Sequence, residues 1–512
     1  MFQWKKAVAA GALALACAAP ALALPPGTAV QVTVNISGAS ASDAFIGNLI
    51  TQLCSVSAND LTTFLDDTNA NGVDDGLGID GSSYQAYSCT LDSSKIPGIG
   101  LTNPTALILK RSAGGSGIGV APVCNGTSVA MMAVTAQNCV DGGGPANRFV
   151  CGAATTSVIP EGGVSDVSPS EVGGGTASTN CDVVKSTFGT GFSAIATTRL
   201  RNALQAAQGL TVGSDTAANM PSISKGQLMS IATGRIQNWR QFMVNGVDLV
   251  TAATNAGLAA PSSDVVTACR RVETSGTTAA FKLRILGSPS GLRNCENGAQ
   301  ELRYPGLPDT GPYVLTEQSS ATDEGNCVAN QDVVNPPQYQ ADPTDPTFLV
   351  DTSNWAIGLQ QSTEENAGLT RSYRFLRVDG VLPTIDNMAN GTWRWWTEST
   401  LQYRSSFPST AQKAILNEIA LEGATPTAVA TANVAALHTW GQGGKVALAA
   451  AGCNVDPNNN NLWETSAPCS GWANTFSGAT NNCTGPYIKA GVETVLGPNE
   501  DNLLTGDGNN PP

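Results

Sequence analysis

The chain has few of the side chains on which most enzymes depend. Its 512 residues include one histidine, His438, and no Cys-x-x-Cys pair, which argues against structural zinc and against haem attachment. The sequence also shows no Asp/His metal cluster and no Ser–His–Asp arrangement, so little is available for general base catalysis. No Walker loop and no dinucleotide fingerprint is present. We therefore predict that the protein is not an enzyme and requires no cofactor.

Positive charge and long apolar runs are also scarce. There are 26 Lys and Arg residues against 40 Asp and Glu residues, a formal net charge of −14. An excess of negative charge argues against nucleic acid or an anionic membrane surface as a partner. Beyond the N-terminus no apolar segment approaches the length needed to span a bilayer, so we expect no membrane insertion.

The N-terminus has the pattern of a secretory signal peptide. Lys5 and Lys6 form a basic start, the run from Ala7 to Ala19 is apolar, and Ala21-Leu22-Ala23 resembles a small-residue cleavage site. We predict that residues 1–23 are a signal peptide and that the mature protein is periplasmic or extracellular. The rest of the chain is long enough for two domains.

Cysteine usage agrees with export. The chain has 13 cysteines, and twelve remain if Cys17 leaves with the signal peptide, so disulfides are the expected state. Pairing each cysteine with a neighbour in the sequence predicts four disulfides and one cluster, and Cys327 could pair with several of these cysteines. The predicted pairs and cluster are Cys54–Cys89, Cys124–Cys139, Cys151–Cys181, Cys269–Cys295 and a group of Cys453, Cys469 and Cys483.

The segment Arg271-Val272-Glu273-Thr274-Ser275-Gly276-Thr277-Thr278 carries the clearest binding chemistry. It follows a predicted strand and precedes a predicted helix. A Ser-Gly-Thr turn at a helix N-terminus directs backbone N–H groups and hydroxyls at one point, where the helix dipole also favours an anion. The guanidinium of Arg271 could add a bidentate fork. A helix cap with a surface arginine would give the same pattern.

Two further strand–turn–helix units have the same character. The alternating strand 30–36 runs into Ser37-Gly38-Ala39-Ser40-Ala41-Ser42, and the apolar strand 106–111 runs into Ser112-Ala113-Gly114-Gly115-Ser116-Gly117. Hydroxyl- and Gly-rich turns after strands allow the backbone to approach a ligand closely. Between 124 and 165 we expect a disulfide-pinned insertion, and it ends at Asp166, which could accept a proton from a ligand or cap a helix.

One acidic segment resembles the first half of a calcium-binding loop. Asp67, Asn69 and Asn71 place side-chain oxygens at alternate positions, Gly72 stands at the turn, and Asp74 follows. The acid expected at the twelfth position is replaced by Gly78. The segment therefore predicts a calcium site in which another aspartate takes that place, and it equally suits a surface turn rich in Asp, Asn and Gly.

In this order, the motifs resemble those of the periplasmic phosphate-binding protein of the high-affinity phosphate ABC transporter. The resemblance covers about two-thirds of the chain, and each motif alone is weak. The matching segments are Ile36–Ser42, Gly115–Gly117, Ser165–Pro169, Gly234–Trp239, Arg271–Thr278, Ala356–Gly358, and Gly380–Thr384 with Asn390–Trp393.

The resemblance implies an α/β, two-lobed type II periplasmic binding protein (a Venus flytrap), with mixed sheets flanked by helices and disulfide-stabilised insertions. Lobe 1 would comprise residues 24–190 and 379–512, and lobe 2 residues 191–378. It implies a monomer that captures inorganic phosphate or a related oxyanion, and an ABC permease as partner. The phosphate-binding residues it implies are Ser42, Ser116, Asp166, Arg271, Ser275, Gly276 and Thr277.

The carried-over residues suit this chemistry, with two points of difference. Asp166 would accept the proton of hydrogen phosphate and repel sulfate, which has none to donate. Asp43 follows Ser42 and would oppose an anion unless it points away, and Ser112 is a rival to Ser116 in a shifted register. Glu273 is a candidate to hold the fork of Arg271 in place.

Three functions follow as hypotheses. The first is phosphate capture by lobe closure. The second is a secreted surface or extracellular protein that uses the same fold for adhesion or assembly. The third, a phosphate-ester hydrolase, has the least support because general base groups are scarce.

Overall fold

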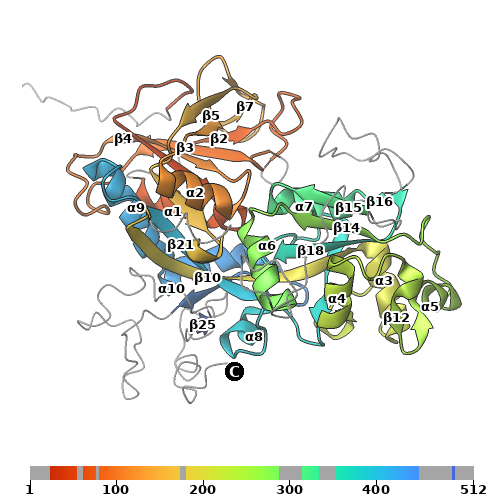
Figure 1. Ribbon diagram of the computed structural model, residues 1–512. Helices are drawn as coiled ribbons and strands as arrows, with labels where there is room; N and C mark the ends of the chain where they lie inside the picture. Colours follow the sequence, from red (N-terminus) through yellow and green to blue (C-terminus); the bar gives the residue numbers. More distant parts are fainter. Residues whose placement is uncertain are drawn as a thin grey trace, which may run out of the picture.

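The computed structural model describes residues 24–54, 61–76, 80–172, 180–287, 314–333, 352–448 and 487–489. The predicted signal peptide, Cys295 and the C-terminal cysteines lie outside these ranges. Among the helices of the described ranges, none is long and apolar enough to cross a membrane. Figure 1 shows two lobes, each a part of one mixed sheet flanked by helices, joined by the long strand β10 (Val183–Thr197). The predicted lobe boundary at residue 190 falls inside β10.

The strands of the large sheet run in the order β15-β14-β18-β10-β21-β9-β1-β4-β3-β2-β7-β6, with β19 and β24 paired to β10. The first lobe holds β1 (Val32–Gly38), β2 (Thr62–Asp66), β3 (Tyr84–Thr90), β4 (Thr105–Arg111), β6 (Cys139–Val140), β7 (Arg148–Cys151), β9 (Gly162–Ser165), β21 (Trp396–Tyr403) and β24 (Lys445–Leu448). The second lobe holds β14 (Thr267–Arg271), β15 (Val314–Gln318), β18 (Ala356–Ser362) and β19 (Tyr373–Phe375).

Helices cover both parts of the sheet (Figure 1). In the first lobe they are α1 (Asp43–Leu53), α2 (Ser116–Asn125), α9 (Thr410–Gly423) and α10 (Pro426–Asn433). In the second lobe they are α3 (Thr198–Ala207), α4 (Lys225–Ala232), α5 (Leu249–Asn255), α6 (Gly276–Phe281) and α7 (Ala321–Ala329), with α8 (Ile385–Ala389) following in the chain.

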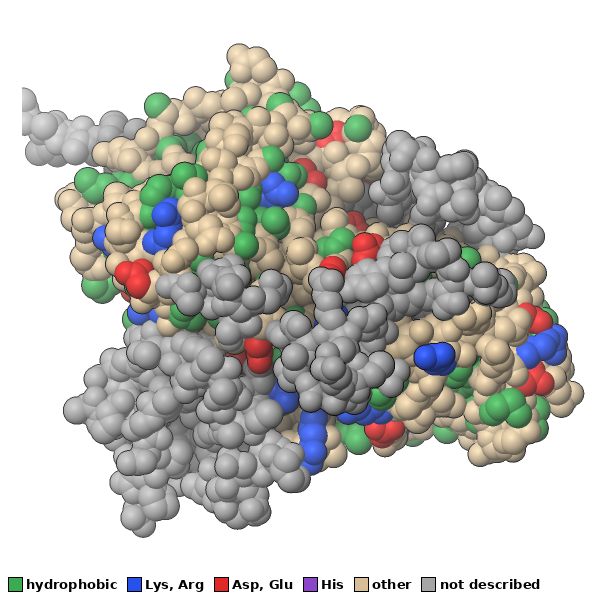
Figure 2. All heavy atoms as spheres, viewed as in Figure 1, with side chains coloured by type: hydrophobic (Ala, Val, Ile, Leu, Met, Phe, Trp, Pro, Cys, Tyr) green, Lys and Arg blue, Asp and Glu red, His purple; other side chains and the backbone are tan. Residues whose placement is uncertain are grey.

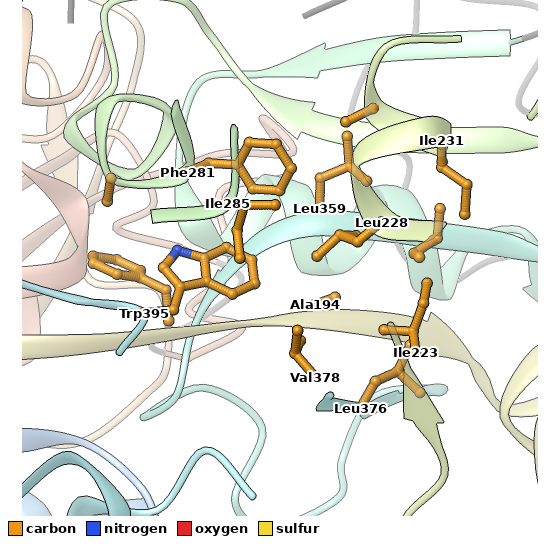
Figure 3. Packing of buried hydrophobic residues seen from close by; sticks show 14 of the residues in the cluster. Ala194, Ile223, Leu228, Ile231, Phe281, Ile285, Leu359, Leu376, Val378 and Trp395 are labelled. Carbon is orange, nitrogen blue, oxygen red and sulfur yellow. The ribbon is translucent and has the colours of Figure 1, made fainter. Parts of the chain in front are cut away.

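The core of the second lobe fixes the direction of α6. Phe281, at the end of this helix, is buried and packs edge-to-face on Trp395 with ring centroids 5.5 Å apart. Figure 3 shows both rings beside Ile285, with Leu228 and Leu359 further along the same cluster. Because one end of α6 is held in this core, its N-terminus is directed toward the first lobe.

Four disulfides are present among the described cysteines, and one pairing prediction is confirmed. Cys54–Cys89 forms as expected. The predicted pairs Cys124–Cys139 and Cys151–Cys181 are wrong, since the bonds are Cys124–Cys181 and Cys139–Cys151. The reason is strand register, because β6 and β7 are antiparallel neighbours and place Cys139 directly opposite Cys151.

The prediction Cys269–Cys295 is also wrong. Cys269 lies on β14 and bonds to Cys327 of α7, which packs on that strand. Sequence proximity misled this prediction, because the pair that forms is 58 residues apart.

The surface is sparsely charged. On the face shown in Figure 2, acidic and basic side chains lie scattered among uncharged ones. This agrees with a chain in which 13% of the residues are charged.

Candidate functional site

Three turns of the first lobe meet at one edge of the sheet. The strands β1, β4 and β9 form a parallel set, with β1 between the other two. Their carboxyl ends therefore lie together, and each is followed by a polar turn. These turns carry Ser40 and Ser42 after β1, Ser116 after β4, and Asp166 after β9.

The second lobe has a matching edge. Here β14 is the centre of a parallel set with β15 and β18. β14 ends at Arg271 and leads into Ser275 and α6, and β15 leads into α7. The Oγ atom of Ser275 accepts the N–H of Thr277, so this residue is the cap of α6 as the sequence predicts.

The two edges are in contact across the lobes at Gly276. A Cβ atom added to Gly276 would lie 2.2 Å from Oγ of Ser116 and 2.9 Å from Cβ of Asp166. Ser116 and Asp166 are themselves linked, since the backbone N–H of Asp166 donates to Ser116 Oγ at 3.0 Å. Only glycine permits this approach, and the sequence-predicted residues Ser116, Asp166 and Gly276 therefore form one cluster.

Arg271 joins the same cluster through a hydroxyl that sequence reasoning missed. Its Nη1 donates to Oγ of Ser40 at 3.0 Å, and Ser40 Oγ also accepts the N–H of Ala321 at the start of α7. Ser42, the predicted residue of this turn, instead donates to the carbonyl of Ala39 at 2.8 Å. The two serines are two positions apart in a Ser-Ala-Ser turn, so the sequence offered both hydroxyls without distinguishing them.

The cluster is buried and holds polar atoms without partners. Arg271, Ser116, Asp166 and Thr277 are each at most 1% exposed. Among the described residues, neither Oδ1 of Asp166 nor Oγ1 of Thr277 has a hydrogen-bond partner. An unpaired polar atom in such a position costs about 1–3 kcal/mol, so the arrangement favours a polar ligand that pairs with both.

Burial and charge act in opposite directions on Asp166. Burial raises the pKa of this carboxyl to about 6, while Arg271, Lys445 and Lys110 act to lower it. At neutral pH the group is therefore ionised and acts as a hydrogen-bond acceptor. Burial likewise lowers the pKa of Arg271, and the carboxylates of Glu324 and Asp166 oppose that shift.

The acid that follows Ser42 is balanced within its own lobe. Oδ1 of Asp43 lies 2.7 Å from Nζ of Lys110, a buried lysine at the end of β4. The same ammonium group donates to the carbonyls of Gly38 and Ala39 at 3.0 and 3.1 Å. Asp43 is thus paired with a cation beside the cluster, which removes most of its opposition to an anion.

Glu273 does not hold Arg271, contrary to our hypothesis. Its carboxylate pairs with Lys282 and lies 3.4 Å from Nη1 of Arg270, whose side chain leaves β14 on the opposite face from Arg271. Arg271 is held by other groups. Its Nη2 donates to the carbonyl of Ser319 at 2.6 Å.

The proposed calcium loop has the hydrogen bonds of a polar turn. The carboxylate of Asp67 accepts the N–H groups of Asn71 and Gly72, and Asp74 forms a bidentate pair with Arg148. Among the described residues no group of three or more His, Cys, Asp or Glu side chains is arranged to hold a metal ion. Calcium binding by Asp67, Asn69, Asn71 and Asp74 stays a prediction.

A cavity of about 550 Å³ opens beside the cluster, between α1 of the first lobe and the segment after β18 of the second. Ser40, Asp43, Glu364 and Glu365 are among the residues that line it. Ser40, which accepts from Arg271, is the residue that joins this cavity to the cluster.

No family model matches this chain, and no curated protein sequence matches it. Solved structures give matches of low identity. A putative phosphate ABC transporter substrate-binding protein with bound phosphate from Clostridium perfringens is 13% identical, with a TM-score of 0.40, covering 78% of this chain and 97% of its own. An ABC-type phosphate transport receptor from Vibrio cholerae is 11% identical, with a TM-score of 0.35 and coverages of 75% and 93%. PstS from Borrelia burgdorferi is 11% identical, with a TM-score of 0.29 and coverages of 76% and 92%.

Proposed function

We propose that this protein is a solute-binding protein that captures hydrogen phosphate between its two lobes, without chemistry. The observation that carries the proposal is the cluster of Arg271, Asp166, Ser116 and Gly276, brought together from both lobes in a buried setting.

The donors and acceptors of the cluster match those of hydrogen phosphate. A desolvated phosphate needs a guanidinium for charge and several N–H or O–H donors. Arg271 supplies the charge, and the Oγ1 atom of Thr277 is a buried hydroxyl without a partner among the described residues. The ionised Asp166, whose Oδ1 also has no partner among the described residues, can accept a hydrogen bond from the O–H that hydrogen phosphate carries. Sulfate lacks that proton and would face the carboxylate directly.

Delivery to an ABC permease, a monomeric state and a periplasmic or extracellular location belong to the same proposal. The four disulfides support an oxidising compartment. The contacts across the lobes support a mechanism of closure around the ligand, because Arg271 of one lobe reaches Ser40 of the other.

Titration calorimetry of the mature protein tests the proposal. Phosphate at pH 7.5 is expected to bind one per chain with a dissociation constant in the micromolar range or tighter, and sulfate at least a hundredfold more weakly. The absence of binding heat with phosphate at two temperatures would overturn the proposal and leave adhesion or assembly as the better hypothesis.

Lobe closure makes a second, more local prediction at Gly117. The backbone N–H of Gly117 donates to the carbonyl of Thr274 across the lobes at 2.8 Å. A Cβ atom at Gly117 would lie 2.8 Å from Cβ of Thr274. Because Gly117 is helical, Gly117→Ala should leave the first lobe folded and obstruct only the closed state. We expect phosphate affinity to fall about tenfold to a hundredfold, from the usual cost of an overpacked contact.

A matched control is available in α4. Gly226 is also helical, and a Cβ atom there would meet nothing closer than 3.9 Å. Gly226→Ala should bind phosphate as the unchanged protein does, and both variants should melt no earlier than it does. Equal affinities for Gly117→Ala and Gly226→Ala would show that contact between Gly117 and Thr274 is not part of the bound state.

A further inference from the structure

A second buried carboxyl lies beside Arg271, on the opposite lobe from Asp166. Glu324 is on α7 and is fully buried. Its Oε1 accepts the backbone N–H of Gln360 at 2.8 Å, and its Oε2 has no hydrogen-bond partner among the described residues. Gln360 in turn accepts the backbone N–H of Arg271 with its side-chain oxygen at 3.1 Å. Gln360 therefore links the carboxyl of Glu324 to the backbone of Arg271.

The charges around Arg271 do not balance when an anion arrives. Of the nearby lysines, Lys110 is paired with Asp43 and Lys445 with Glu364. In the part of the chain that the structure describes, Arg271 is then the cation that acts most strongly on two buried carboxyls, Asp166 and Glu324, and Asp323 acts on Arg271 as well. Adding hydrogen phosphate would bring two more negative charges into a site with little solvent to screen them. Asp166 can stay ionised because it accepts a hydrogen bond from the O–H of hydrogen phosphate, but Glu324 receives no such hydrogen bond from the ligand.

The groups around Glu324 include one strongly acting cation, so its carboxyl can take up a proton when the effect of that cation is offset. Arg271 of β14 is the charged group that acts most strongly on it. From β18 it accepts the backbone N–H of Gln360. From β19 the buried Tyr373 lies close enough for the charge of Glu324 to help raise the pKa of its hydroxyl, while Arg371 acts to lower that pKa. Burial raises the pKa of Glu324 itself to about 7, with Arg271 acting against that shift. The carboxyl is thus near the midpoint of its titration at neutral pH.

We propose that Glu324 is the proton acceptor of this site, taking up one proton from solvent when hydrogen phosphate binds and so making affinity depend on pH. This inference rests on the proposed function. Glu324 does not touch the ligand. It acts on the ligand through Arg271, because its own charge changes how much of the guanidinium's positive charge is offset, and it is therefore a positioning residue. The product is a neutral carboxylic acid, and no other bond changes.

The proton count per phosphate tests this role. Calorimetry at pH 8 in two buffers of different ionisation enthalpy gives the number of protons taken up on binding. The unchanged protein is expected to take up close to one proton more than Glu324→Gln, because any proton exchange by phosphate itself is common to both. Glu418→Gln on α9, where burial also raises the carboxyl pKa, is the matched control and should behave as the unchanged protein. Equal proton counts for the unchanged protein and Glu324→Gln would overturn the inference.

The unchanged protein provides a test that needs no variant. Between pH 8 and pH 9 its phosphate affinity should fall about tenfold, which is the slope for uptake of one proton. A change of less than about twofold over this unit would contradict the inference even if Glu324→Gln does not fold. If the unchanged protein shows no phosphate binding at any pH, the proposed function fails first, so the two failures can be told apart.

Discussion

Replacing Arg271 by alanine is expected to weaken phosphate binding about a thousandfold. The side chain is fully buried, and the carboxylates of Glu324 and Asp166 are the charges that act on it most strongly. Its removal leaves two buried carboxyls without their cation, and breaking a buried ion pair costs about 3–5 kcal/mol. Calorimetric titration of Arg271→Ala with phosphate at pH 7.5 measures the loss.

Two further variants separate charge from geometry. Arg271→Lys keeps a positive charge but loses the planar fork, so an intermediate loss of about ten- to a hundredfold is expected. Arg240→Ala removes an exposed arginine that pairs with Asp264, and it should bind phosphate normally. Full affinity in a folded Arg271→Ala protein, shown by an unchanged circular dichroism spectrum, would remove Arg271 from the site.

Asp166→Asn is expected to reduce the preference for phosphate over sulfate by about a hundredfold. An ionised carboxylate accepts the proton of hydrogen phosphate but opposes sulfate, whereas an amide can donate to either ion. Mismatched buried groups of this kind account for discrimination of several kcal/mol. The measurement is a pair of titrations, phosphate and sulfate, for each protein at pH 8. An unaltered ratio of affinities would show that Asp166 does not read the ligand's proton.

The same carboxyl gives the selectivity a pH dependence. Because burial raises the pKa of Asp166 to about 6, the group is ionised at pH 8 and becomes a protonated donor as the pH falls through that value. Sulfate affinity of the unchanged protein should therefore rise from pH 8 to pH 5 more steeply than that of Asp166→Asn, in which Glu324 titrates but residue 166 does not. An equal rise in sulfate affinity for both proteins over this range would contradict the role of Asp166.

The parts of the site that sequence reasoning could find are those carried by local motifs. Each strand–turn–helix unit predicts its own polar turn, and the parallel order of β1, β4 and β9 then brings Ser116 and Asp166 together. Arg271 and Gly276 were found in the same way, since they are five residues apart on one strand–turn–helix segment. The sequence does not tell which of the two serines in one turn, Ser40 or Ser42, contacts Arg271.

The contacts that the sequence did not predict depend on side-chain direction and on packing between residues far apart in the chain. Glu273 is near Arg271 in sequence, yet it pairs with Arg270 and Lys282. Glu324 is far from Arg271 in sequence and reaches it because α7 packs against β14 and β18. The same cause explains the disulfides, where Cys139 finds Cys151 by strand register and Cys269 finds Cys327 by helix packing.

The most direct test of the account is a crystal structure of the mature protein grown with arsenate, a phosphate analogue whose arsenic atom can be located by anomalous scattering. The account predicts a single strong anomalous peak between the lobes, with ligand oxygens within hydrogen-bond distance of the Arg271 guanidinium, Asp166 Oδ1 and Thr277 Oγ1. A closed protein without a peak at this cluster, or with arsenate bound elsewhere, would contradict it.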